Sequence, residues 1–138
     1  MLQTGLKGKS EITVTEDRTA RAMGSGELDV LATPAMIALI EETAWRSLAP
    51  HLAPGESTVG TKLEISHLAA TPVGMTVSCE TEVIEVDRRR IVLRAEVFDA
   101  CGKIGEGLHE RFLVQSERFL ARAREKLARN GCAAAEKP

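Results

Sequence analysis

Aromatic residues are scarce in this chain of 138 residues, which has one Trp, three Phe and no Tyr. Proteins that bind single-stranded nucleic acids stack bases on aromatic side chains, and proteins at a membrane interface are anchored by Trp and Tyr. Basic residues are not in excess either, because 18 Lys and Arg stand against 20 Asp and Glu, a formal net charge of −2. We therefore expect no nucleic-acid partner and no membrane partner.

Cysteine is also rare, and the three cysteines (Cys79, Cys101 and Cys132) form no Cys-x-x-Cys pair. An odd number without paired spacing supports neither a disulfide framework nor a zinc site. No apolar run approaches the ~18 residues of a membrane-spanning helix, and the first ten residues lack the apolar segment of a signal peptide. These absences favour a reducing compartment, so we expect a cytoplasmic protein.

The apolar residues that are present suffice for one hydrophobic core. They make up 43% of the chain, and a domain of this size buries roughly two thirds of the surface that its unfolded chain exposes. We expect a single domain over residues 1–138. Asn130 and Gly131 are a helix stop signal, so residues 131–138 are predicted to form a frayed tail.

The predicted order of elements is one strand, one long helix, four antiparallel strands and a last helix. The long helix covers residues 34–48, and the other elements cover residues 10–15, 59–69, 75–86, 91–97, 103–115 and 116–129. Residues 16–26 show no periodicity and contain two glycines, which is typical of a mobile loop or lid. This order predicts an α+β fold in which an antiparallel sheet wraps around one helix.

Both the long helix and the strand that follows it carry an ionisable residue where apolar residues are expected. On the helix, Glu41 falls inside the apolar stripe formed by Ile37, Ile40, Ala44 and Leu48. On the strand, His67 and Thr61 share the phase of Val59, Leu63 and Ile65. After Val83 the apolar phase of the next strand shifts by one residue, which predicts a bulge.

Glu41 and His67 are the main candidates for chemistry. Burial raises the pKa of a carboxylate unless a donor or a cation is near, so a buried Glu41 calls for a reason. The alternatives are that Glu41 lies at the edge of the stripe and that His67 is a core histidine bound to a backbone carbonyl. Together the two residues supply an acid and an imidazole for acid-base chemistry near neutral pH.

Thr33 and Gly60 are the remaining candidates. Thr33 precedes Pro34, and its hydroxyl either caps the helix or meets a substrate at the positive end of the helix dipole. Gly60 either allows a backbone amide to approach a ligand oxygen or marks a bulge. His67 and His109 have no further ligand at a suitable spacing, so we expect no metal. The basic residues 88–90 and those of the last helix are solvent-exposed faces or phosphate contacts.

Five runs of residues together are characteristic in type and spacing. The runs are Thr33-Pro34-Ala35-Met36-Ile37-Ala38-Leu39-Ile40-Glu41, residues 48–56, Val59-Gly60-Thr61, residues 66–72 and Gly107-Leu108-His109-Glu110-Arg111. These runs resemble those of the hot dog fold thioesterases related to fluoroacetyl-CoA thioesterase. The resemblance covers residues 6–127 and is specific in spacing as well as in residue type.

The resemblance implies a long helix wrapped by an antiparallel sheet, a homodimer, and hydrolysis of an acyl-CoA thioester at a dimer cleft. No separate cofactor is implied, because coenzyme A belongs to the substrate. The family's catalytic threonine, glutamate and histidine fall on Thr33, Glu41 and His67. The glycine that helps to hold the thioester carbonyl falls on Gly60, and a family arginine falls on Arg111.

The lid segment departs from the family. The fluoroacetyl enzymes carry phenylalanines there, whereas residues 20–30 contain no aromatic residue, so we expect a general or different short acyl group. Two alternative functions on the same fold stay open at this point. One is an enoyl-CoA hydratase, and the other is an acyl-CoA binding protein without catalysis.

Overall fold

The computed structural model of the chain describes residues 2–129. The predicted tail, residues 131–138, and Cys132 lie outside the described residues. The described part contains five strands, three α-helices and two 3-10 turns. They are β1 (Lys7–Thr13), a turn at Glu16–Arg18, α1 (Ala20–Met23), α2 (Thr33–Leu48), a turn at Ala49–His51, β2 (Glu56–His67), β3 (Thr76–Asp87), β4 (Arg90–Asp99), β5 (Gly102–Gln115) and α3 (Ser116–Ala128).

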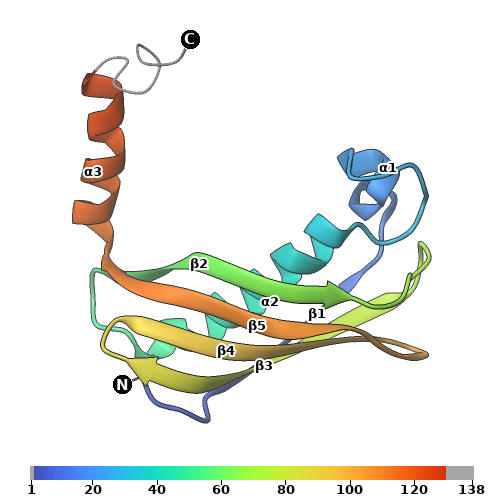
Figure 1. Ribbon diagram of the computed structural model, residues 1–138, viewed down its shortest axis with the longest axis horizontal. Coiled ribbons are helices and arrows are strands. Elements are labelled where there is room, and N and C mark those ends of the chain that lie inside the picture. Colours follow the sequence, from blue (N-terminus) through green and yellow to red (C-terminus); the bar gives the residue numbers. More distant parts are fainter. Residues whose placement is uncertain (1, 130–138) are drawn as a thin grey trace.

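The five strands form one antiparallel sheet in the order β1-β3-β4-β5-β2. Consecutive strands β3, β4 and β5 pair as two hairpins, while β1 and β2 form the two edges. Figure 1 shows α2 crossing behind this curved sheet, with its first turn near α1 and its last turn near the start of β2. The predicted α+β class and the helix-wrapping sheet of the hot dog fold are therefore confirmed.

The core lies between α2 and the sheet. Alternation along the strands works as predicted, because the apolar residues of one phase in β3 and β4 are buried (Val77, Cys79, Val83, Ile91, Leu93, Ala95 and Val97). The predicted register shift after Val83 is present. At Gly8 a Cβ atom would lie 2.7 Å from Ser47 Cβ and 3.0 Å from the Thr43 carbonyl, so glycine allows β1 to pack closely on α2.

The buried face of α2 is rotated from the predicted stripe. Its fully or nearly fully buried residues include Met36, Leu39, Ile40, Thr43, Ala44 and Leu48. Ile37 is only partly buried. Glu41, one turn further along the same side, therefore lies at the edge of the buried face rather than inside it. Of the two alternatives for Glu41, the structure supports the position at the edge of the stripe.

The segment between β1 and α2 has more local structure than predicted. Residues 16–26 contain a 3-10 turn and the short helix α1 instead of an unstructured loop. Thr19 caps α1, because its Oγ1 accepts a hydrogen bond from the Ala22 amide at 3.1 Å. Gly24 ends α1 in the left-handed conformation at φ 76°.

The last helix, α3, packs little against the rest of the molecule. None of its residues is buried, and Figure 1 shows it standing away from the end of the sheet, past the β2 edge. Gln115 is the N-cap residue of α3, and the Ser116 hydroxyl lies 2.6 Å from that of Ser57. Within residues 2–129, no helix is long and apolar enough to cross a bilayer.

Candidate active site

A β-bulge in β2 sets the geometry of the candidate site. Gly60 pairs with Arg111 and Lys62 pairs with Glu110, so Thr61 is an extra residue without a partner on β5. Residues that face each other in an antiparallel pair point to the same side of the sheet. The bulge therefore places Gly60 on the inner face, which α2 covers.

Because of the bulge, the first part of β2 has the opposite phase from the one predicted. Val59 and Thr61 were expected on the inner face with His67. Val59 instead pairs with the outward-facing Phe112, and Thr61 is exposed. His67 keeps its predicted side, opposite Gly105. The prediction assumed strict alternation along the strand, and one extra residue reverses that alternation.

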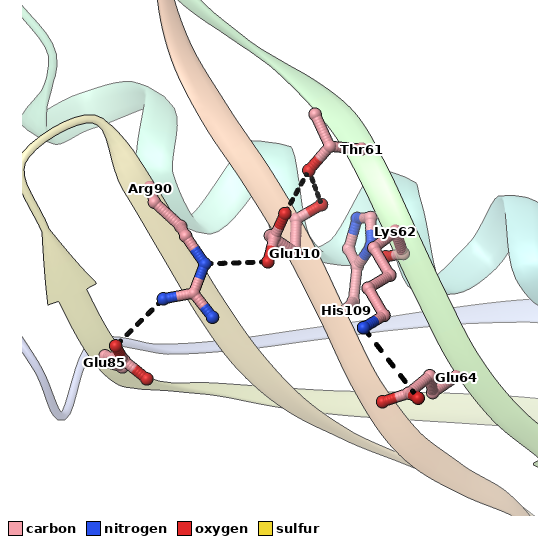
Figure 2. Close-up of polar contacts among 7 residues, drawn as sticks. All are labelled: Thr61, Lys62, Glu64, Glu85, Arg90, His109 and Glu110. Atoms are coloured by element: carbon pink, nitrogen blue, oxygen red, sulfur yellow. Dashed lines mark hydrogen bonds and ion pairs between the residues drawn. The ribbon is translucent and has the colours of Figure 1, made fainter.

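Polar contacts on the outer face hold the bulge in place (Figure 2). The Thr61 hydroxyl lies 3.1 Å from the carbonyl oxygen of Glu110 and 3.0 Å from its Oε2. Arg90 donates from Nε to Glu110 at 2.8 Å and from Nη1 to Glu85 at 2.9 Å. The hydrogen bonds from Arg90 and Thr61 lower the pKa of Glu110, so the network keeps its charge at neutral pH.

On the inner face, Glu41 meets Gly60 and Arg111. Nη1 of Arg111 lies 3.7 Å from Oε2 of Glu41. A Cβ atom at position 60 would collide with the same carboxylate oxygen, so only glycine leaves room for it. The Glu41 side chain is 40% exposed, whereas that of Arg111 is 6% exposed. Arg111 on β5 therefore supplies the positive charge that stabilises the Glu41 carboxylate on α2.

The Arg111 guanidinium is held by several partners. It donates from Nε to Thr58 Oγ1 at 2.8 Å and from Nη2 to the Thr58 carbonyl at 2.9 Å. Its Nη1 lies 3.2 Å from Nε2 of His109. Burial lowers the pKa of Arg111 and the charge of Glu41 opposes that shift, but a guanidinium stays charged in either case. The cation thus has a fixed orientation toward Glu41.

Thr33 and His67 form the second part of the candidate site. The Thr33 hydroxyl lies 2.7 Å from Nδ1 of His67. The alternative that Thr33 caps α2 was wrong. The helix already begins at Thr33, and its N-cap residue, Ala32, makes no side-chain hydrogen bond to the helix end. The hydroxyl is therefore free to pair with the imidazole.

The imidazole of His67 is suited to proton transfer. Burial lowers its pKa, and the backbone of Ala69 partly offsets the shift. The ring is therefore largely neutral at neutral pH. Its Nε2 is buried and has no hydrogen-bond partner within the described chain. A neutral imidazole with one free nitrogen can accept or donate a proton to a bound molecule.

Within one chain, the structure forms two groups rather than one. Thr33 meets His67, and Glu41 meets Gly60 and Arg111. Thr33 and Glu41 are eight residues apart on one helix, which corresponds to about 12 Å along its axis. Each group holds part of the predicted set, and a single small acyl group does not span both.

Sequence reasoning missed the structural roles of His109 and Thr58. His109 was considered only as a metal ligand, but it is fully buried and contacts Arg111. The signal was available, because positions 109 and 111 of a strand share one face. Among residues 2–129, no three His, Cys, Asp or Glu side chains are grouped as a metal site requires.

Comparisons with known proteins identify the family. The family model for fluoroacetyl-CoA-specific thioesterase, FlK, matches residues 14–117. The fluoroacetyl-CoA thioesterase of Streptantibioticus cattleyicolor is 41% identical over 98 residues, which cover 71% of this chain and 70% of that protein.

Solved structures agree with this assignment. A structure of the fluoroacetyl-CoA thioesterase FlK superimposes with a TM-score of 0.86 at 35% identity, covering 91% of this chain and 98% of that one. A thioesterase superfamily member from Thermus thermophilus gives a TM-score of 0.86 at 27% identity, covering 94% and 96%. The chain therefore belongs to the fluoroacetyl-CoA-specific thioesterase family and is a thioester hydrolase of the hot dog fold.

Proposed function

We propose that the protein hydrolyses a short-chain acyl-CoA thioester to the free acid and CoA, at a cleft between two copies of the chain. The observation that carries this proposal is the division of the site into two groups. Thr33 and His67 lie at one end of α2 and β2, while Glu41 and Gly60 lie further from that end on the same elements, beside Arg111 of β5. Both groups face the inner side of β2, so a second chain beside β2 completes each group.

Strand β2 is the element that supports this assembly. It is an edge strand of 12 residues, all of which are exposed or only partly buried. A long unprotected edge offers unpaired backbone groups to another strand. Two copies related by a twofold axis pair these strands in antiparallel fashion. The Gly60 end of one β2 then lies beside the His67 end of the partner's β2.

The chemistry follows from the charges and protonation states of these groups. Glu41 acts on the thioester carbonyl, either as the nucleophile or as the base that removes a proton from water. Arg111 fixes the direction of the carboxylate, and His67 transfers the proton that the departing CoA thiolate takes up. Thr33 polarises the substrate or positions the imidazole. Backbone amides near Gly60 stabilise the negative oxygen of the intermediate, at ~3 to 4 kcal/mol per donor in a comparable site.

The acyl group is proposed from the lid. One relative of known structure, a variant of the fluoroacetyl-CoA thioesterase at 33% identity, was solved with fluoroacetate and CoA. The lid of the present chain, residues 20–30, has no aromatic residue that would contact a fluorinated acyl group. We therefore expect acetyl-CoA and other short acyl-CoAs to be hydrolysed without a preference for fluoroacetyl-CoA.

The basic test is release of free thiol from a panel of acyl-CoAs by wild-type protein and by the Glu41→Gln and His67→Ala variants. Loss of turnover in both variants supports the proposal. Wild-type rates in either variant would refute it. Crotonyl-CoA in the same panel separates hydrolysis from hydration, because only hydrolysis releases CoA. Tight acyl-CoA binding without turnover would indicate a binding protein.

A mixing experiment tests the shared site. Glu41→Gln and His67→Ala proteins are each expected to be inactive, but a mixed dimer regains one intact site if Glu41 of one copy works with His67 of the other. Random mixing then restores about a quarter of wild-type activity. No recovery after confirmed subunit exchange would place all catalytic groups within one chain and contradict the shared cleft.

A further inference from the structure

His109 lies at the centre of the inner face and has no part in the mechanism given above. Its exposed fraction is 0%. Groups from three elements face it, namely Arg111 on its own strand, Lys62 of β2 and Glu41 of α2. A histidine buried this deeply is costly unless both ring nitrogens have partners.

The two partners fix the protonation state of the ring. Nδ1 lies 3.0 Å from the carbonyl oxygen of Lys62, which only accepts, so Nδ1 carries the hydrogen (the ring is shown in Figure 2). Nε2 lies 3.2 Å from Nη1 of Arg111, which only donates, so Nε2 is the acceptor. His109 is therefore neutral, as the Nδ1–H tautomer.

The charged surroundings of His109 agree with a neutral ring. Burial and the adjacent Arg111 lower its pKa, while the bond to Lys62 and the more distant charges of Glu41 and Glu110 oppose this shift. Protonation would remove the acceptor and place a second positive charge against the guanidinium. The neutral ring is thus the only form that bonds to Arg111.

Nη1 of Arg111 serves two partners, His109 Nε2 and Glu41 Oε2. The bonds from Nε and Nη2 to Thr58 fix the far side of the guanidinium. The bond to His109 fixes the side that faces Glu41, and the Nδ1–H bond ties the ring to β2 directly after the bulge at Thr61. His109 thus joins Arg111 to the strand that carries Gly60.

We propose that His109 is a positioning residue for hydrolysis, which as the neutral Nδ1–H tautomer holds Nη1 of Arg111 in place and thereby directs the Glu41 carboxylate. This inference rests on the proposed function of Glu41. His109 itself does not touch the acyl group, and its effect passes through Arg111.

Two substitutions separate this role from simple core packing. In His109→Asn, the side-chain amide nitrogen occupies the place of Nδ1 and keeps the bond to Lys62, but the acceptor for Arg111 is lost. In His109→Gln, the side-chain oxygen reaches the place of Nε2 and keeps that acceptor, while the bond to Lys62 is lost. Both variants remove the ring and each keeps one of its two bonds, so the pair distinguishes the acceptor for Arg111 from the donor to Lys62.

We expect His109→Asn to lower kcat at least tenfold with little change in KM, since misdirection of a catalytic group acts on the chemical step. His109→Gln is expected to keep kcat within about threefold of wild type. Equal losses in both variants that follow their melting temperatures would overturn the inference, as would a wild-type kcat in His109→Asn.

Nitrogen NMR of the wild-type imidazole rings tests the tautomer even if neither variant folds. The inference predicts Nδ1–H for His109 at pH 7 to 8, and an Nε2–H or a charged ring there would overturn it. Glu41→Gln is assayed in parallel. Wild-type activity there would refute the proposed function and this inference together, whereas inactive Glu41→Gln beside fully active His109→Asn would refute only the inference.

Discussion

Replacement of Gly60 by alanine tests the candidate site most directly. A Cβ atom at position 60 would lie 3.3 Å from His109 Cε1 and 3.4 Å from Arg111 Nη1, and it would collide with the Glu41 carboxylate. The first two contacts are tight but tolerable. The third forces the carboxylate oxygen to retreat by about 1 Å to reach an ordinary contact distance.

This retreat should cost activity rather than stability. The Glu41 side chain is flexible and 40% exposed, so it can move into solvent. Alanine in place of glycine also reduces the entropy of the unfolded chain, so the free energy of unfolding should change by less than about 1 kcal/mol. A displacement of about 1 Å at a catalytic group corresponds to a loss of roughly 10²-fold in kcat.

The assay is thiol release from acetyl-CoA together with urea unfolding of the same preparations. Gly8→Ala is the matched control, because its Cβ would meet the Thr43 carbonyl and Ser47 rather than a mobile carboxylate. We expect that variant to lose ~1 to 3 kcal/mol of stability while its folded fraction keeps the wild-type kcat. A wild-type kcat in Gly60→Ala would refute the reasoning.

The other predictions concern single groups. Thr33→Val should leave the free energy of unfolding within about 1 kcal/mol, because Thr33 does not cap α2, and should lower kcat by roughly 10²-fold. Thr33→Ser, which keeps the hydroxyl, should be active, and a fully active Thr33→Val would contradict a role of the hydroxyl beside His67. Burial lowers the pKa of His67 and His109 below the usual 6.5, so the unfolded chain binds these protons more tightly. The free energy of unfolding should therefore be at its maximum above about pH 6.5 and should fall as the pH drops below that value. The midpoint of urea unfolding measures this change. A midpoint that rises on acidification would contradict buried neutral rings. Burial raises the pKa of Cys79 to about 11, so a disulfide reagent should modify the exposed Cys101 in the native protein and Cys79 only after unfolding. Rapid native labelling of Cys79 would show that the core opens readily.

Much of the fold follows from periodicity. Alternation along β3 and β4 predicted which side chains are buried, because both strands lie inside the sheet and contact α2 on one face. The same reasoning failed in β2, which is an edge strand. None of the residues of β2 is buried, whereas β3 and β4 each contain several buried residues, so the pattern alone did not locate the extra residue at Thr61.

The candidate site was predictable in its residue types but less so in its arrangement. Glu41, His67 and Thr33 stood out because polar groups occupied an apolar stripe, a strand phase or a helix start. Which of them meet depends on lengths along α2 and β2, and those lengths separate Thr33 and His67 from Glu41. Arg111 became informative only when the register placed it opposite Gly60.

The extra residue in β2 also determines which changes in length the strand can accept. Gly60 and His67 are seven positions apart, an odd number, and in a regular strand they would point to opposite sides of the sheet. The bulge at Thr61 gives them a common face, so a deletion of Thr61 would make the spacing even and leave both residues facing inward in a regular strand. Removal of one residue between Lys62 and His67, with the bulge still in place, would instead turn His67 to the outer face. The length of β2 and its bulge are thus matched, and a change in one requires a change in the other.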